Sequence, residues 1–199
     1  VTVSDVRLIG MPETRDDSVV TAEDTVAQII AIANDVDANQ QGFAPVVVAG
    51  PAHGVVVVNA DGTFSYTPDK DFAGSDSFTY KFSNGQVDSN VSTVNVVVTP
   101  VNDAPQAAAL DATWAEDGTF TFDLLAQAND VEGATLVASI VNGPAHGTLV
   151  CNADGSFTYT PEANYVGTDS FTYTVNDGEL DSAPATVTPC SVPSNRPSL

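Results

Sequence analysis

The sequence predicts an all-β protein built from two tandem β-sandwich domains, and three observations support this prediction. The chain contains a long internal repeat, its apolar residues alternate with polar ones in short segments, and turn-forming residues separate these segments. It has 199 residues, of which 43% are hydrophobic. It is therefore long enough for one or two domains and apolar enough to fill their cores.

The internal repeat indicates how the chain is organised. Residues 50–80 align with residues 143–173 at an offset of 93 without a gap, and 20 of the 31 aligned residues are identical. The pair Asn34-Asp35 recurs as Asn129-Asp130, at an offset of 95. A period of this length is typical of tandem copies of one structural unit. We predict a first domain over 1–100, a linker over 101–105 that its flanking prolines stiffen, and a second domain over 106–199.

Each copy has the pattern of a series of strands. Phe78, Tyr80 and Phe82 alternate with polar residues, and the aligned segment 171–175 does the same. This period of two is typical of half-buried strands, and about seven of them per copy suit an immunoglobulin-like Greek-key sandwich. The segment 27–33 has a weak helical pattern, but the aligned part of the second copy resembles a strand.

Turns separate the strands at equivalent places in both copies. The string Asn-Ala-Asp-Gly at 59–62 recurs at 152–155 and predicts hairpin turns in which glycine takes a positive φ. Asp61 and Asp154 are therefore expected to form turns rather than to bind a metal. Asp76 and Asp169 precede strands, and we expect their carboxylates to accept hydrogen bonds there. Pro189 is expected to interrupt the final strand.

The charge balance excludes several kinds of partner. The chain has 26 acidic and 5 basic residues, and its formal net charge is −21. Nucleic acids and anionic membranes attract Lys and Arg, so neither is expected as a partner. An acidic chain attracts cations, and Ca²⁺ in particular takes oxygen ligands. The same acidity also suits a surface adapted for solubility or for salt.

We expect neither enzyme activity nor membrane insertion. The chain has no Gly-x-Ser-x-Gly string, and His53 and His146 are separate, equivalent residues that suit turns. No apolar run approaches the ~18–20 residues of a membrane helix. Residues 1–10 lack the features of a signal peptide, so a secretion signal would lie outside this sequence.

Three further side chains leave alternatives open. Cys151 and Cys190 replace Val58 and Val97 of the first copy, which favours small apolar residues, although one disulfide bridge would suit an extracellular protein. Trp114 is the only tryptophan. We expect it to pack at the domain junction, whereas an exposed tryptophan could stack on a sugar ring.

Specific strings connect the sequence to a known family. The strings NADGTFSYTP, GSDSFTYKFSNG and PVNDAP, taken together, resemble the cadherin-like tandem repeats of large bacterial surface proteins and secreted adhesins. The resemblance covers both copies. It implies cadherin-like sandwiches in an exported array, with Ca²⁺ bound between successive domains.

The resemblance also implies a set of Ca²⁺ ligands at the junction between the two copies. The family pattern uses an early acidic residue, an acidic pair midway along the domain, an Asn-Asp linker and an Asp-x-Asp string of the next domain. The matching residues are Glu23, Asp69, Asp71, Asn102, Asp103, Asp130, Glu132 and Asp177. In the second copy Glu162 and Asn164 replace Asp69 and Asp71, and Asn195-Arg196 replaces the linker pair, so no second complete site is expected.

Three functions are compatible with these features. The first is a non-catalytic, Ca²⁺-stiffened spacer or adhesion segment of a larger bacterial surface or secreted protein. The second is a carbohydrate-binding module of a secreted polysaccharide-degrading enzyme, and the third is a domain for Ca²⁺-dependent homophilic contact between cells. Expected partners are calcium ions and, beyond them, surface proteins, polysaccharide or copies of the same chain.

Overall fold

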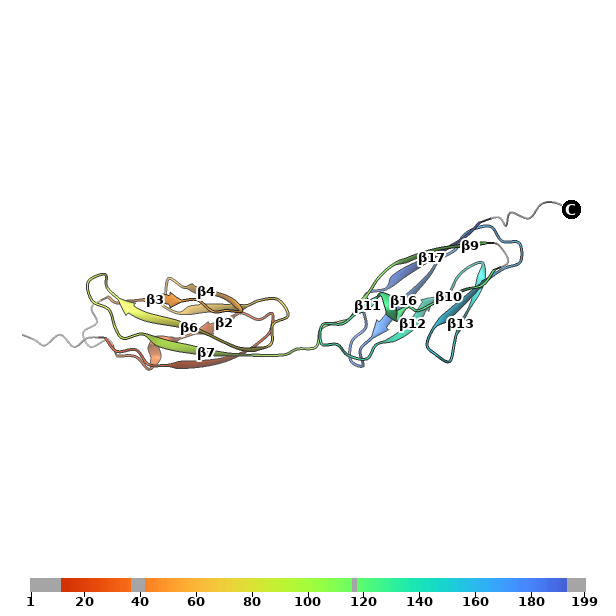
Figure 1. The fold of residues 1–199 in the computed structure, drawn as a ribbon. Helices are drawn as coiled ribbons and strands as arrows, with labels where there is room; N and C mark the ends of the chain where they lie inside the picture. The colour runs from red at the N-terminus through yellow and green to blue at the C-terminus, as the bar shows by residue number, and fades with distance from the viewer. Residues whose placement is uncertain (1–11, 37–41, 116–117, 193–199) are drawn as a thin grey trace, which may run out of the picture. The chain divides into compact units, whose positions relative to one another are not determined.

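Strands form in both repeats where apolar residues alternate with polar ones. The computed structural model describes residues 12–36, 42–115 and 118–192, so the predictions for residues 1–10 and 195–196 lie outside the described residues. Contacts divide the chain into two units, Val1–Val101 and Asn102–Leu199, and each unit is a β-sandwich (Figure 1). The predicted all-β fold with two tandem sandwiches is confirmed.

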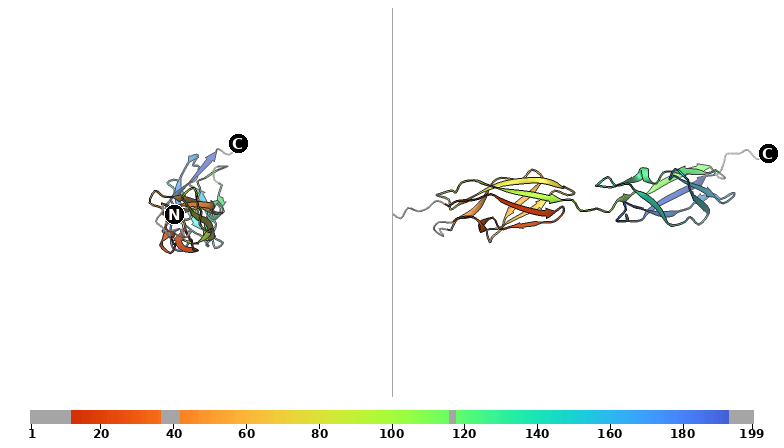
Figure 2. Two further views of the ribbon diagram at one scale, coloured as in Figure 1. Left: turned by 90° about the vertical axis from the view of Figure 1, so that its left-hand side faces the viewer. Right: turned by 90° about the horizontal axis from the view of Figure 1, so that it is seen from below.

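The first domain consists of two sheets. The larger has the strand order β1-β7-β6-β3 and the smaller has the order β2-β5-β4, and two further views show both layers (Figure 2). Strand β1 is parallel to β7, and the other neighbours are antiparallel. The elements are β1 (Asp17–Ala22), β2 (Ala27–Ile29), η1 (Ala31–Ala33), β3 (Ala44–Ala49), β4 (Gly54–Val58), β5 (Phe64–Pro68), β6 (Gly74–Ser83) and β7 (Ser92–Thr99).

The second domain repeats this arrangement. One sheet has the order β12-β16-β17-β15 with β9 parallel to β17, a second has the order β10-β14-β13, and β8 pairs with β11. The elements are β8 (Gln106–Ala107), β9 (Leu110–Ala115), β10 (Phe120–Phe122), η2 (Leu125–Gln127), β11 (Ala128–Asn129), β12 (Val137–Asn142), β13 (Gly147–Cys151), β14 (Phe157–Pro161), β15 (Gly167–Thr168), β16 (Phe171–Asn176) and β17 (Ala185–Val192).

The segment 27–33 contains no α-helix. It forms a short strand, β2, followed by the single 3-10 turn η1, and the aligned segment of the second domain has the same pair, β10 and η2. The predicted hairpin turns are also confirmed, since Gly62 and Gly155 both have a φ of 84°.

Each domain has its own aromatic core. Phe64, Tyr66, Phe78 and Tyr80 are buried between the sheets of the first domain, and the aligned residues of the second domain are buried in the same way. Buried and less buried residues alternate along β6 and β16, which confirms the expectation of half-buried strands. Because each core is complete within one repeat, each domain can fold as a unit.

The tryptophan and cysteine alternatives are resolved. Trp114 packs against the core of its own domain, with its ring stacked on Phe120 (5.8 Å between centroids) and edge-on to Tyr159 (5.2 Å). Packing, rather than an exposed platform for a sugar, is therefore what the structure shows. The predicted place was wrong, however, because Trp114 packs in the core of the second domain and not at the domain junction. Cys151 and Cys190 are both free thiols and form no bridge.

The prediction that Pro189 interrupts the final strand is wrong. β17 continues through Pro189 to Val192, where it runs beside β9. The interruption falls instead on the neighbouring strand, because β6 of the first domain is one strand whereas its counterpart is divided into β15 and β16. Pro189 lacks an N–H, so it cannot complete the ladder opposite Asp169, although its carbonyl still accepts the Asp169 N–H at 2.8 Å.

Candidate functional site

Glu23 holds the chain where it leaves the first domain. It follows β1 directly and is only 5% exposed. Its N–H donates to the Thr99 carbonyl at 3.0 Å, and its Oε1 accepts the N–H of Val101 at 2.5 Å. An ionised carboxylate has about four lone-pair sites, so Glu23 can still offer an oxygen to a metal ion.

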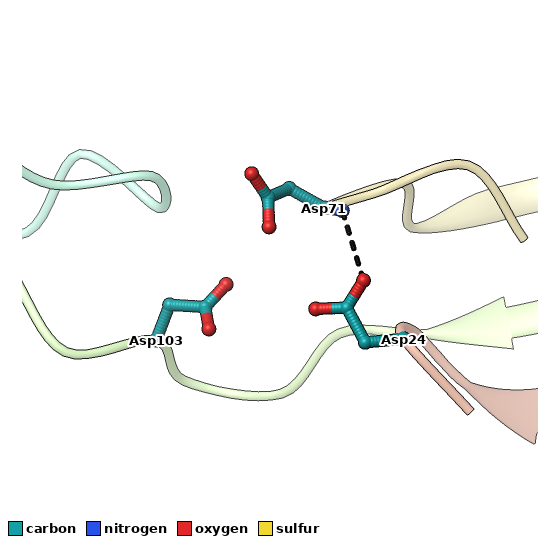
Figure 3. Close-up of side chains that lie close together, drawn as sticks. All are labelled: Asp24, Asp71 and Asp103. Carbon is teal, nitrogen blue, oxygen red and sulfur yellow. Dashed lines mark hydrogen bonds between the residues drawn. The ribbon is translucent and has the colours of Figure 1, made fainter.

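Two aspartates lie side by side at this end of the first domain. The Asp71 N–H donates to Asp24 Oδ1 at 3.3 Å, and Figure 3 shows this bond together with the side chain of Asp103. Each of these three aspartates can offer a carboxylate oxygen to a metal ion. Asp24 is a residue that the ligand prediction missed, although the pair Glu23-Asp24 recurs in the second copy as Glu116-Asp117.

The turn that carries Asp69 and Asp71 does not itself require their negative charges. The Asp69 carbonyl accepts the N–H of Phe72 at 3.2 Å, and Asp71 has a φ of 57°. Asn164, at the equivalent place in the second domain, has a φ of 59°. Asp and Asn both tolerate this left-handed conformation, so the backbone explains a short polar residue but not a carboxylate. Lys70 pairs with Asp71 at 2.6 Å and offsets part of the charge.

Four predicted ligands come together in two pairs at the start of the second domain. Asn102 Nδ2 donates to Asp177 Oδ2 at 2.7 Å. The Asp103 N–H donates to Glu132 Oε2 at 3.4 Å. These contacts join the linker sequence to two loops of the second domain, which are 29 and 75 residues away along the chain.

Asp177 is held as a carboxylate. The N–H groups of Leu180 and Glu179 both donate to its Oδ1 at 2.7 Å. These two backbone groups, followed by the Asn102 side chain, lower the pKa of Asp177 below its ordinary value. Its negative charge is therefore present at neutral pH, as a cation ligand requires.

The carboxylate of Asp130 indicates whether the predicted ligands suit a cation. Its Oδ1 accepts the Ala134 N–H at 2.8 Å, while its Oδ2 is buried and finds no hydrogen-bond partner among the described residues. A buried carboxylate oxygen without a partner is costly, and a bound cation would satisfy it. Since the predicted ligands all carry side-chain oxygens, they suit a hard ion such as Ca²⁺.

A different acidic group lies against Tyr80 in the first domain. The Tyr80 hydroxyl is within hydrogen-bond distance of Asp35 Oδ2 (2.9 Å), Asp17 Oδ2 (3.0 Å) and the Arg15 carbonyl (3.2 Å). One phenol proton cannot serve three acceptors fully. Burial raises the pKa of both Asp17 and Asp35, and the neighbouring Asp35 charge raises that of Asp17 further.

Replacing Asp35 by asparagine is expected to stabilise the first domain at neutral pH by about 1 kcal/mol, since the amide removes a like charge and donates to Tyr80. A raised folded pKa gives stability that is complete below the ordinary value of 3.8 and is lost as the pH rises through the raised pKa. The gain from Asp35→Asn should therefore shrink on acidification. Thermal unfolding of the unmodified protein and of Asp35→Asn, compared between about pH 4 and pH 7, measures this gain in stability.

The second domain provides the control for this substitution. Its equivalent tyrosine, Tyr173, donates to the Ala108 carbonyl at 2.7 Å. The unfolding transition of the second domain should therefore stay unchanged in Asp35→Asn. A loss of stability of the first domain at pH 7 would contradict the expectation.

Comparison with known families identifies both units. Residues 10–100 match the bacterial cadherin-like domain, and residues 102–189 match the bacterial Ig domain. The chain is a tandem of bacterial cadherin-like and Ig-like domains. Domains of these two families are typically non-catalytic, and cadherin-like repeats are typical of extracellular adhesion and spacer modules.

Some solved structures are similar to this chain at low sequence identity. Human protocadherin-24 EC1-2 is 16% identical, with a TM-score of 0.51, and the match covers 91% of this chain and 98% of that one. Human mucin-like protocadherin EC1-2 is also 16% identical, with a TM-score of 0.47 and coverage of 92% and 98%.

A third similar structure belongs to a larger protein. An endo-fucoidan hydrolase from glycoside hydrolase family 107 is 20% identical, with a TM-score of 0.39, and the match covers 93% of this chain but only 29% of that one. A search of curated proteins found no match. Within the described part of the chain, no helix has the length and apolar character needed to cross a membrane.

Proposed function

We propose that this tandem is a non-catalytic, Ca²⁺-stiffened spacer or adhesion segment of a larger bacterial surface or secreted protein. The family match supports an extracellular module of this kind. In this proposal the segment 101–105 is a hinge that Ca²⁺ makes stiff, and the cation takes ligands from both domains. The partners are calcium ions and, through the larger protein, another surface.

The buried oxygen of Asp130 is the observation that carries the metal part of the proposal. Its other oxygen is already used by a backbone N–H, and Oδ2 finds no donor in the described part of the chain. A cation at this oxygen would remove the cost of burying it. In the proposal Asp103, two residues beyond Val101 in the sequence, supplies a further carboxylate to the same ion.

The proposed ligand set combines the predicted residues with one that the structure adds. It comprises Glu23, Asp69, Asp71, Asn102, Asp103, Asp130, Glu132 and Asp177, together with Asp24. Ca²⁺ takes roughly 6–8 oxygen ligands, so this set is sufficient for at least one ion. Without a cation these carboxylates would repel one another, which favours an open hinge.

We expect calorimetry on chelator-treated protein to show Ca²⁺ binding that weakens at least about tenfold in Asp71→Asn, since an amide replaces a charged ligand. The substitution should leave the turn intact, because Asn164 adopts the same φ at the equivalent place. Small-angle scattering should show a longer, narrower particle when Ca²⁺ is added to the unmodified protein.

Glu162→Gln is the matched control for calorimetry. Glu162 is the exposed counterpart of Asp69 in the second domain and lies outside the proposed ligand set. Its replacement should leave Ca²⁺ affinity unchanged. Absence of binding at millimolar Ca²⁺ would refute the metal site, and binding with an unchanged scattering profile would refute the stiffening.

A further inference from the structure

One stretch of the first domain contains no charged residue. The chain has 31 charged residues, yet none lies between Asp37 and Asp61, a stretch that contains β3 and β4. A second uncharged stretch, from 133 to 153, contains the equivalent strands β12 and β13. In a chain of net charge −21, these strands are the places where another copy can approach with least repulsion.

Strand β4, which lies in this stretch, is an open edge of its sheet. Among the described residues it pairs only with β5, in a continuous register from Gly54↔Pro68 to Val58↔Phe64. An edge strand presents a row of backbone N–H and C=O groups that another strand can pair with. β3 is also an edge, but Pro45 and a register shift between Val47 and Ala49 make it less suitable for pairing.

The outer face of β4 is aliphatic. Val55 is 61% exposed and Val57 is 54% exposed, on the face opposite the core. Natural edge strands are usually protected by charges, prolines or bulges, and β4 has none of them. An exposed, apolar edge without a bulge is typical of a strand that pairs with another strand.

A second copy of this chain suits the β4 edge better than a sugar does. Sugar-binding faces use exposed aromatic rings, whereas the exposed large hydrophobic side chains of the described residues are all Val, Ile or Leu. A second copy brings an identical uncharged strand, with matching valines and a matching row of backbone groups. It therefore satisfies the hydrogen bonds and the apolar face together.

We propose that two copies of this chain associate by antiparallel pairing of their β4 strands, which joins two three-stranded sheets into one of six strands. The pairing is isologous, since the same edge is used by both copies. If it is centred on Val56, Val55 of each copy faces Val57 of the other across the new ladder. Such opposite pairs bring their Cβ atoms to roughly 4.5–5.5 Å.

Sedimentation velocity over a range of concentrations tests this proposal. The two-domain protein is studied with a chelator, so that Ca²⁺ effects are absent, and with a reductant, so that the exposed thiol of Cys151 cannot cross-link copies. The unmodified protein should dimerise, and Val57→Lys should weaken the dimer by about tenfold or more, since a charge on the edge opposes strand pairing.

Val97→Lys is the matched control. Val97 is also exposed, at 45%, but it lies on β7, which has β1 and β6 as neighbours. This variant should dimerise like the unmodified protein. A monomer at all concentrations, or equal weakening by both substitutions, would overturn the proposal.

A charge-pair experiment tests the register. Val57→Lys and Val55→Asp should each dimerise poorly alone, whereas a mixture of the two should form a heterodimer in which Lys and Asp face each other. Recovery in the mixture supports antiparallel pairing centred on Val56, and failure to recover would overturn that register. Because the chelator is present throughout, these results are independent of the proposed Ca²⁺ site.

Discussion

Replacing Asp169 by alanine is expected to destabilise the second domain by about 3 kcal/mol, since it removes charge-assisted hydrogen bonds and leaves buried donors unsatisfied. Asp169 is only 6% exposed. Its Oδ1 accepts the N–H groups of Ala145 at 2.9 Å and Ser170 at 2.8 Å. Its Oδ2 accepts the His146 N–H and the Tyr159 hydroxyl, both at 2.9 Å.

The ionisation of this carboxylate gives the expected effect a definite pH dependence. Burial alone would raise the pKa of Asp169, but the three backbone N–H groups and the Tyr159 hydroxyl outweigh it and lower the pKa. A lowered folded pKa gives stability that is present above the ordinary value of 3.8 and is lost as the pH falls through the folded value. The difference between unmodified protein and Asp169→Ala should therefore be largest near neutral pH.

Differential scanning calorimetry can measure this effect domain by domain. The transition of the second domain should fall by roughly 10–20 °C, while that of the first stays in place. Asp111→Ala is the control, because Asp111 is an exposed residue of β9 in the same domain. Asp76→Ala should act in the same way on the first domain, where Asp76 makes the equivalent contacts. A shift below about 2 °C for Asp169→Ala would contradict the expectation.

Much of the fold follows from local patterns in the sequence. The alternation of Phe78, Tyr80 and Phe82 predicts which side chains enter the core, and all three are buried. The turns at 59–62 and 152–155 are equally local, since the glycine that takes a positive φ lies within the motif itself. Period and turn chemistry depend on neighbouring residues, so one sequence is sufficient to predict them.

The features that escaped prediction depend on contacts between distant residues. Asp24 and Asp71 are 47 residues apart, and only the folded loops bring them together. Pro189 affects β15 and β16 rather than its own strand, because its missing N–H removes a hydrogen bond to the neighbouring strand.

The repeat itself also conceals a difference between the domains. Tyr80 and Tyr173 are identical in the alignment, yet Asp17 lies against Tyr80 where the second copy has Leu110. Sequence identity at one residue does not reveal what surrounds it. The acidic candidates differ in another way, because the replacement of Asp71 by Asn164 is visible in the alignment itself, and the structure adds only that both residues adopt the same φ.

Replacing Gly147 by alanine is expected to destabilise the second domain by about 2–3 kcal/mol, because an added methyl group must displace a packed strand. A Cβ at Gly147 would lie 2.5 Å from Tyr159 Cε2 and 2.6 Å from the Thr160 carbonyl oxygen. A backbone oxygen cannot rotate away, so β13 and β14 would have to separate. Chemical denaturation of the second domain measures this loss.

Two comparisons make the Gly147 expectation specific. Gly143→Ala is the control, since a Cβ there meets no described atom within 4 Å. Tyr159 also donates to the His146 carbonyl and to Asp169 Oδ2, at 3.2 and 2.9 Å, so displacing its ring weakens the contacts of Asp169. Gly147→Ala and Asp169→Ala should therefore combine to less than the sum of their separate effects. Full additivity would show that the methyl group acts on β13 and β14 without moving the Tyr159 ring.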